Sequence, residues 1–387
     1  MNNNKELTFI DFFAGVGGFR LGFEQAGFKC IGFCENDKYA VKSYRAIFNT
    51  EEEWYRDDIN TIKSEDIPYT DIWCGGTPCQ DVSIAGARKG LSGDRSGLFF
   101  KLIELLKDKD EKDKPTYLVL ENVKGLLSSH RGFDFTEYLH QISQAGYDGL
   151  WQVLNSKDFG VPQNRERVFF IGYLRSRGRR KILPITGENQ SAIKQVVGGC
   201  QGNRILDPKG ISCTLTGNGG GWGGKTGLYF IDQSSKKTKI TKNSRCITSR
   251  YTAGIVNRTA SNSAVLESPT IKVRNGTKKG YDEASLGDGI SLAYPNSKTR
   301  RGRVGKGVAQ TLDTSCMQGT LTENYRIRRL TPRECFRLQG FPDELFDKIK
   351  DLNSDSQLYK QAGNAVTANV AYEVALSIKN TISEEKP

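Results

Sequence analysis

The sequence predicts an α/β protein with a doubly wound, mostly parallel sheet and a second, smaller, irregular β-rich domain. Within residues 8–173, short apolar runs alternate with amphipathic stretches of helix length, the pattern of strands and helices in a parallel sheet. Residues 174–330 hold 22 of the 42 glycines and few helical periods, which indicates short strands and loops. The 387 residues are enough for two domains of ordinary size.

Five buried strands are expected in the first domain, at the runs LTFIDFFAG, KCIGFCEN, DIWCGG, TYLVLEN and RVFFIGY. Between them, GGFRLGFEQAG and SGLFFKLIELLKDK have the spacing of amphipathic helices. In such a sheet, ligands bind at the carboxyl ends of the strands. We therefore place a first, ligand-binding domain at residues 1–173.

The middle segment, residues 174–330, is predicted to be a separate domain that contacts a polyanion. It contains 28 Lys plus Arg against 9 Asp plus Glu, a net charge of +19, whereas the rest of the chain has 28 against 35. A basic block beside an acidic remainder is typical of a nucleic-acid reader attached to a domain with another ligand. The alternative is a basic surface that is merely solvated.

Helical structure is expected to return after this segment. The run TPRECFRLQGF has Thr331 as a helix N-cap and Pro332 at the first helical position. The run TANVAYEVALSIKNTI has the pattern of an amphipathic helix. We assign residues 331–355 to a hinge and residues 356–387 to a C-terminal helix.

The composition argues against a membrane, secreted or zinc-binding protein. No stretch approaches the ~18 apolar residues of a membrane span. Nine scattered cysteines, no CxxC pair and only His130 and His140 are poor material for a disulfide framework or a zinc site. We expect reduced thiols, no metal and a cytoplasmic location.

A glycine-rich turn and an acid mark a nucleoside-binding site. DFFAGVGG follows the first strand and opens a helix, so that its backbone N–H groups can approach a ligand. Glu35 stands at the end of the second strand, where a ribose diol is held in sheets of this kind. The pair fits NAD as well as S-adenosylmethionine, and a tight turn followed by a surface acid is the alternative.

A thiol, a carboxyl group and two arginines are predicted to meet at the strand ends. Cys79 lies just past the strand DIWC, and Glu121 ends the strand TYLVLEN. With no histidine nearby in sequence, a Cys79 thiolate would need backbone dipoles or arginines to favour it. Arg165 and Arg167 carry that charge. Inert packing of the thiol and a surface ion-pair ladder of the arginines are the alternatives.

Together these motifs resemble those of DNA cytosine-5 methyltransferases of the bacterial restriction-modification and phage type. DFFAGVGG, GGTPCQDVS, DRSGLFF, ENVKGL, FGVPQNRERVFFIG, RRLTPRECFRLQGFP and QAGNAV occur in the family's order, over most of residues 8–173 and 329–370. The resemblance implies a catalytic domain with the class I S-adenosylmethionine-dependent methyltransferase fold and a small target-recognition domain. It also implies that the last helix returns to the catalytic domain.

The resemblance also assigns roles to residues. Cys79 would attack C6 of cytosine, Glu121 would share or donate a proton at N3, and Arg165 and Arg167 would hold the base and a phosphate; the base must be flipped out of the duplex. The residues implied for the S-adenosyl-L-methionine site are Phe13, Ala14, Gly15, Gly17, Gly18, Glu35, Asn36, Asp58, Ile59, Pro78, Leu98, Asn364, Ala365 and Val366. Those implied for DNA contacts are Gln80, Ser83, Gln163, Gln201, Arg204, Thr214, Thr216, Asn218 and Gly219.

The chain departs from the family pattern at several positions. Asn36 stands where many relatives have Trp, so adenine stacking is weaker or comes from elsewhere. Asn218 stands where a GCGC-methylating relative has an aromatic residue, and residues 228–325 have no match in that relative. The recognition sequence therefore stays open.

The expected function is methylation of C5 of cytosine in a specific double-stranded DNA sequence by a monomeric cytoplasmic enzyme, with any cognate restriction endonuclease acting separately. A tRNA-methylating relative is the nearest rival, disfavoured by the long basic recognition region. An idle DNA-binding protein would not need Cys79, Glu121 and both arginines together. An NAD oxidoreductase would leave the PCQ and QNRERV motifs without a role.

Overall fold

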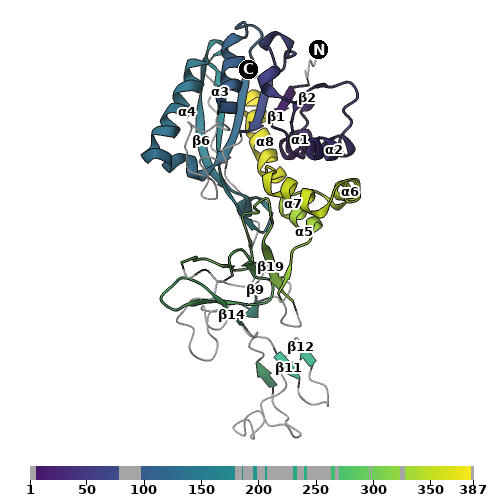
Figure 1. The fold of residues 1–387 in the computed structure, drawn as a ribbon, viewed down its shortest axis with the longest axis vertical. Helices are drawn as coiled ribbons and strands as arrows, with labels where there is room; N and C mark the ends of the chain where they lie inside the picture. Colours follow the sequence, from purple (N-terminus) through teal and green to yellow (C-terminus); the bar gives the residue numbers. More distant parts are fainter. Residues whose placement is uncertain are drawn as a thin grey trace. The chain divides into compact units, whose positions relative to one another are not determined.

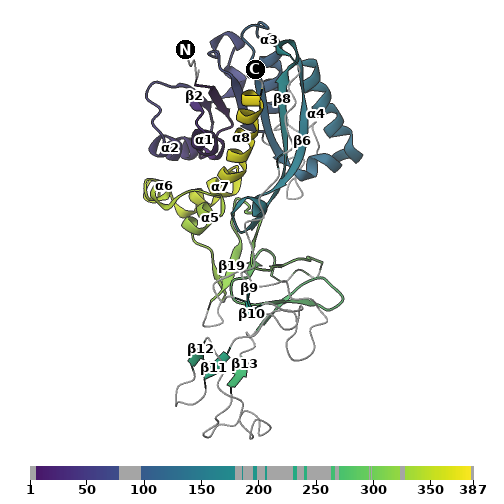
Figure 2. The same ribbon diagram turned by 180° about the vertical axis from the view of Figure 1, so that it is seen from behind.

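The computed structural model describes residues 6–77, 97–178, 185, 270–295, 297, 299–322 and 327–384, and short strands at 195–197, 205–206, 230–232, 239–241 and 263–265. The chain divides into two compact units, drawn in Figures 1 and 2. The first unit comprises Met1–Glu188, Ala309–Gln318 and Arg329–Pro387; the second comprises Asn189–Val308 and Gly319–Arg328. The predicted domain boundaries remain predictions, but this division places Ala309–Gln318 in the first unit.

A seven-stranded sheet of order β3-β2-β1-β4-β5-β8-β6 forms the centre of the first unit. Its strands are β1 (Thr8–Phe12), β2 (Lys29–Cys34), β3 (Trp54–Arg56), β4 (Ile72–Gly76), β5 (Tyr117–Val123), β6 (Tyr147–Asn155) and β8 (Glu166–Leu174). The strands from β3 to β5 pair in parallel, whereas β8 runs antiparallel to both β5 and β6. The predicted α/β class with a mostly parallel sheet is confirmed.

Helices cover both faces of this sheet (Figure 1). They are α1 (Gly18–Gln25), α2 (Lys38–Ile47), α3 (Gly97–Asp108), α4 (Phe133–Gln144) and α8 (Ala368–Glu384), and the 3-10 turns are η1 (Ile59–Thr61), η2 (Ser64–Asp66), η4 (Lys124–Gly132), η5 (Ser156–Phe159) and η6 (Arg175–Arg177). Apolar side chains of α3 and α4 pack in one core cluster, and those of α1 and α8 in another. The run TANVAYEVALSIKNTI forms α8, but the predicted helix of residues 356–387 is divided, since α7 ends at Asn364 and α8 begins at Ala368. Gly22 permits its close approach to α1, because a Cβ there would lie 2.5 Å from the Ala368 carbonyl oxygen.

Three short helices precede α8: α5 (Pro332–Leu338), α6 (Asp343–Asp347) and α7 (Asp355–Asn364). Thr331 caps α5, since its hydroxyl accepts the Glu334 N–H while the Glu334 carboxylate accepts the Thr331 N–H. The predicted N-cap at Thr331 is therefore confirmed.

None of the helices in the described ranges is long and apolar enough to cross a membrane.

The described part of the second unit consists of short strands, as predicted. They are β9 (Gln195–Val197), β10 (Ile205–Leu206), β11 (Phe230–Asp232), β12 (Lys239–Thr241), β13 (Ser263–Val265), β14 (Ile271–Arg274), β15 (Tyr281–Ala284), β16 (Gly289–Ser291) and β17 (Val304–Gly305). β19 (Gln318–Leu321) and β20 (Ile327–Arg329) complete a four-stranded sheet with β16 and β17. A small core of Val273, Ala284, Ile290 and Leu321 lies within this unit.

Candidate active site

The glycine-rich turn after β1 is a tight, left-handed connection to α1. Phe13, Gly15 and Gly17 have φ angles of 55°, 56° and 92°, a backbone region that favours glycine. At Gly18, the first residue of α1, a Cβ would lie 2.0 Å from the Val366 carbonyl oxygen. Two predicted parts of the cofactor site, almost 350 residues apart in sequence, are therefore in backbone contact because Gly18 has no side chain.

Glu35 ties this turn to the end of β2. Its Oε2 accepts the Gly15 N–H at 2.8 Å and its Oε1 accepts the Asp37 N–H at 2.7 Å. Ala14 is buried in the same turn, and Asn36 is exposed. Burial raises the pKa of Glu35, and the backbone N–H donors oppose this. A carboxylate can accept about four hydrogen bonds, so acceptor sites remain for a ligand diol.

An apolar wall adjoins this turn. Ile59 is buried in one core cluster, and Phe13 and Leu98 pack against that cluster while partly exposed. Asp58 precedes Ile59 and caps η1, since its Oδ1 accepts the Asn60 N–H at 2.9 Å. The predicted residues Phe13, Ile59 and Leu98 thus belong to one apolar cluster, in which Phe13 and Leu98 are partly exposed.

The ends of β4 and β5 converge, as the sequence predicts. Asn122 donates through Nδ2 to the Thr77 hydroxyl at 2.9 Å, and that hydroxyl donates to the Glu121 carbonyl at 3.4 Å. A Cβ at Gly76 would lie 3.4 Å from Glu121 Oε2 and 3.5 Å from Val366 Cγ2. The carboxylate, the end of β4 and the segment before α8 therefore meet at one point.

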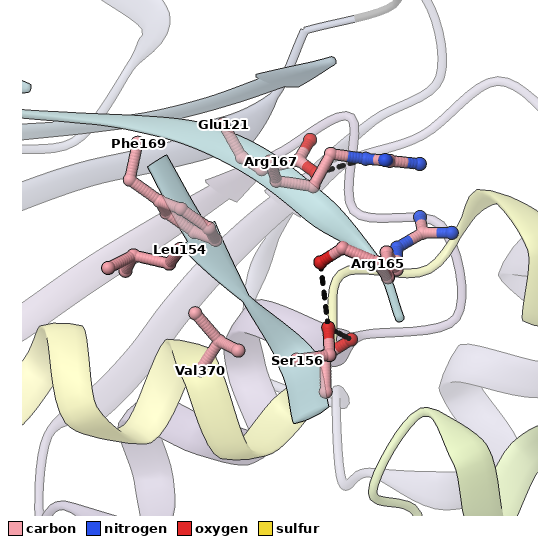
Figure 3. Close-up of a pocket in the computed structure, with 8 residues that line it drawn as sticks. Glu121, Leu154, Ser156, Arg165, Arg167, Phe169 and Val370 are labelled. Atoms are coloured by element: carbon pink, nitrogen blue, oxygen red, sulfur yellow. Dashed lines mark hydrogen bonds and ion pairs between the residues drawn. The ribbon is translucent and has the colours of Figure 1, made fainter. Parts of the chain in front are cut away.

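Glu121 and Arg167 form a mostly buried ion pair in this region. Arg167 Nε lies 3.0 Å from Glu121 Oε1, but the oxygen has no hydrogen-bond partner among the described residues. Burial lowers the pKa of Arg167, and the charge of Glu121 opposes this effect. Figure 3 shows the small recess around the pair, which is lined by Glu121, Leu154, Ser156, Arg165, Arg167, Phe169, Thr367 and Val370. The pair holds the carboxylate beside the end of β4.

Arg165 is bonded to the backbone of two distant segments. Its Nη1 donates to the Leu312 carbonyl at 3.2 Å, and its Nη2 donates to the carbonyls of Gly363 at 3.2 Å and Ala365 at 2.8 Å. The residue is only 3% exposed, and burial lowers the pKa of Arg165 to about 9. The Nη atoms of Arg165 therefore already donate to protein carbonyls. The predicted contact of Arg165 with the target base stays a prediction.

Gln163 is fully buried, although the resemblance implies a DNA contact. Its Nε2 donates to the Leu338 carbonyl at 2.7 Å, and its Oε1 accepts the Leu312 N–H at 3.1 Å. This arrangement gives the predicted DNA contact no support. The sequence reasoning missed Thr77 and the Leu312 segment, because Leu312 lies 147 residues from Arg165 and carries no local signal of that contact.

The remaining predicted site residues fall into two groups. Asn364 is exposed at the end of α7, and Ala365 and Val366 are buried in the following segment. The predicted residues Pro78, Cys79, Gln80, Ser83, Gln201, Arg204, Thr214, Thr216, Asn218 and Gly219 lie outside the described residues.

Comparisons with known proteins show the family and the fold. A family model described as C-5 cytosine-specific DNA methylase matches residues 7–380. The orphan methyltransferase M.Rho11sI of Bacillus phage rho11s is 30% identical, with 98% of this chain and 99% of the relative covered. The type II methyltransferase M.DsaV of Dactylococcopsis salina is also 30% identical, with 96% and 85% covered. The solved methyltransferase EhMeth of Entamoeba histolytica has a similar fold, with a TM-score of 0.53 at 18% identity over 99% of this chain and all of that one.

Proposed function

Because this chain belongs to the C-5 cytosine-specific DNA methylase family and is a DNA cytosine-5 methyltransferase, we propose that it modifies cytosine within a specific double-stranded sequence through a covalent bond between Cys79 and C6. S-adenosyl-L-methionine is the proposed methyl donor. The observation that carries the proposal is the convergence of the Glu121 carboxylate, Gly76 and Val366 at the strand end that leads to Cys79.

The described residues fit this cofactor. Glu35 has free acceptor sites for two ribose hydroxyl groups, and it is anchored by the N–H groups of Gly15 and Asp37. Phe13 and Leu98, the partly exposed side chains packed against the cluster that contains Ile59, form the proposed apolar surface for the adenine ring. When bound, the cofactor supplies a methyl group on a sulfonium centre. The absence of Trp after Glu35 makes this apolar surface the proposed support for adenine.

Cytosine C5 is too weak a nucleophile to take a methyl group directly, so the chain must first add electron density to the ring. We assign this to the Cys79 thiolate, whose sulfur forms a bond with C6. Covalent geometry keeps the Cα of Cys79 within about 7 Å of the Cα of Thr77, and the Thr77 hydroxyl donates to the Glu121 carbonyl. Arg167 lies beside Glu121, and its positive charge is the proposed source of thiolate stabilisation once Glu121 is protonated.

Glu121 takes part in its protonated form, which passes a proton to N3 of the ring as the sulfur adds to C6. The electron pair of the former C5–C6 double bond then resides at C5, which would take the methyl group as the methyl–sulfur bond of the sulfonium breaks and its electron pair stays on the cofactor sulfur. A base next removes the C5 proton, the C6–sulfur bond breaks to restore the aromatic ring and the thiolate, and the N3 proton returns to Glu121. The target base has to leave the helical stack for these steps, because C6 is not accessible within a duplex.

The proposed substrate is double-stranded DNA rather than tRNA. The net +19 of residues 174–330 supports contacts to many phosphates. We propose that the enzyme acts as a monomer in the cytoplasm, and that any cognate restriction endonuclease is a separate protein.

Bisulfite sequencing of DNA and tRNA from a host that expresses this chain tests the proposal. Wild type should protect cytosines in one short DNA sequence from conversion, and Cys79→Ala should protect none. Glu121→Gln should protect few, since it cannot pass a proton in the same way. Protection confined to tRNA would show that the substrate is wrong. Full protection by Cys79→Ala would show that the nucleophile is wrong.

A further inference from the structure

Two side chains of the run QNRERV hold both backbone polar groups of Leu312. Gln163 Oε1 accepts the Leu312 N–H at 3.1 Å, and Arg165 Nη1 donates to its carbonyl at 3.2 Å. Beside them, β18 (Ala309–Gln310) pairs in parallel with β7 (Gln163–Asn164). Leu312 itself is 1% exposed. A buried backbone held at both polar groups has little freedom to move.

The stretch that contains Leu312 has a distinct place in the chain. Ala309–Gln318 belongs to the first unit, but the residues directly before and after it belong to the second. This stretch is therefore where the chain of the second unit passes into the first and out again. It also lies against α7, because a Cβ at Gly363 would be 2.3 Å from the Asp313 carbonyl oxygen.

The same arginine holds the segment 363–366. Arg165 Nη2 donates to the carbonyls of Gly363 and Ala365. The next residue, Val366, lies with its carbonyl against Gly18 and its side chain against Gly76. A guanidinium is planar and presents its donors in a fixed fork, so one side chain can bridge carbonyls on different segments in a way that an ammonium cannot.

We propose that Arg165, assisted by Gln163, is a positioning residue that fastens Ala309–Gln318 and the segment 363–366 to one anchor. Ala309–Gln318, which is continuous in sequence with the second unit on both sides, and segment 363–366 of the proposed cofactor site thereby keep one fixed arrangement relative to each other. The proposal rests on the proposed function in one respect, since that function assigns segment 363–366 to the binding of S-adenosylmethionine. This positioning role differs from holding the target base, because Arg165 would order the two segments even when no DNA is bound.

The test compares wild type with Arg165→Lys and Arg165→Gln by calorimetric titration of S-adenosylmethionine without DNA. Both variants should bind at least tenfold more weakly. For Arg165→Lys, KM for the cofactor should rise about tenfold while kcat changes less than threefold. Hydrogen exchange in Ala309–Gln318 and in 363–366 should become at least tenfold faster. Arg175→Gln is the matched control, since its exposed arginine, paired with Asp148, should change none of these values.

A second variant disturbs the same junction without touching the arginine. Gly363→Ala places a methyl group against the Asp313 carbonyl, although alanine favours a helix more than glycine does. It should give the same faster exchange in Ala309–Gln318 and the same weaker cofactor binding. If Arg165→Gln does not fold, Arg165→Lys and Gly363→Ala decide the matter.

Two results would overturn the proposal. One is wild-type cofactor affinity and exchange in Arg165→Lys and Gly363→Ala. The other is a loss confined to kcat with DNA bound, which would return Arg165 to a contact with the base. Failure of the wild-type protein to bind S-adenosylmethionine would instead refute the proposed function, so that the two failures are distinguishable.

Discussion

Replacement of Glu35 by alanine should weaken the binding of S-adenosylmethionine strongly. The carboxylate accepts backbone N–H groups at 2.8 and 2.7 Å, which fixes it at the end of β2 with acceptor sites left for the ribose. Loss of hydrogen bonds to a charged acceptor costs about 1.5 to 3 kcal/mol. Since each 1.4 kcal/mol is a factor of ten, Kd should rise about 10- to 150-fold.

Glu35→Gln separates the charge from the shape. The amide keeps one acceptor oxygen but turns an NH2 group toward Gly15 or Asp37, whose N–H groups need an acceptor. We expect an intermediate loss of affinity, with the Glu35→Ala variant folded and only modestly less stable. Glu65→Gln serves as the control, because Glu65 and its partner Lys63 are both exposed.

The pH dependence follows from the burial of this carboxylate. Burial raises the pKa of Glu35 above the ordinary value of 4.5. Only the ionised form accepts both ribose hydroxyls, so affinity should fall on acidification at a pH above 4.5. The sign for folding is opposite: a raised carboxyl pKa favours folding at low pH, and this contribution is lost as pH rises through the folded value.

Calorimetric titration of wild type, Glu35→Ala, Glu35→Gln and Glu65→Gln between pH 5 and pH 8 measures these effects. We expect the affinity for S-adenosylmethionine to be equal in wild type and Glu65→Gln, lower in Glu35→Gln and lowest in Glu35→Ala. We also expect that the fall in affinity on acidification disappears in Glu35→Gln. Tight binding of NAD, or cofactor affinity indifferent to Glu35, would refute the assignment of this site.

Two further predictions concern folding and DNA binding. Arg20→Met should lower the free energy of unfolding by about 3 to 5 kcal/mol in urea titrations, because it leaves the Glu53 carboxylate, now paired at 2.7 Å, partly buried without a cation. Arg20→Met with Glu53→Met should cost less than Arg20→Met alone, and the reverse order would contradict the ion-pair argument. DNA affinity should fall linearly on a log-log plot against salt, by about 0.9 in slope per phosphate contact. A slope near zero would mean that the charge of residues 174–330 is only solvated surface.

Local signals allowed much of the fold to be predicted. Apolar runs identified five strands of the central sheet, and the Thr331 cap identified the start of α5. The three-residue edge strand β3 and the strand β6 were missed. β6 alternates buried and exposed positions around polar residues, so that it is not a continuous apolar run. The antiparallel direction of β8 depends on its neighbours β5 and β6 and leaves no mark in its own residues.

The candidate site was predictable where it depends on strand ends. Glu35 and Glu121 lie at or beside the carboxyl ends of β2 and β5, which parallel strands bring to one edge. Arg167 lies near the start of β8 and reaches the same edge because β8 runs antiparallel to β5. The partners of Gln163 and Arg165 were not predictable, because they lie 147 to 200 residues away in sequence and are backbone carbonyl and N–H groups. Any residue type offers such groups, so the sequence carries no sign of the contact.

The covalent bond from Cys79 to C6 is tested most directly with DNA that carries 5-fluorocytosine at the methylated position. Release of the enzyme requires loss of a proton from C5, and fluorine cannot leave as a cation. Protein and DNA should stay joined through denaturing electrophoresis, and only when S-adenosylmethionine and the recognition sequence are present. Cys79→Ala should give no adduct. Cys74→Ala should still give one, because Cys74 is fully buried and burial raises the pKa of its thiol well above the ordinary value. An adduct formed by Cys79→Ala, or lost only in Cys74→Ala, would show that Cys79 is not the nucleophile.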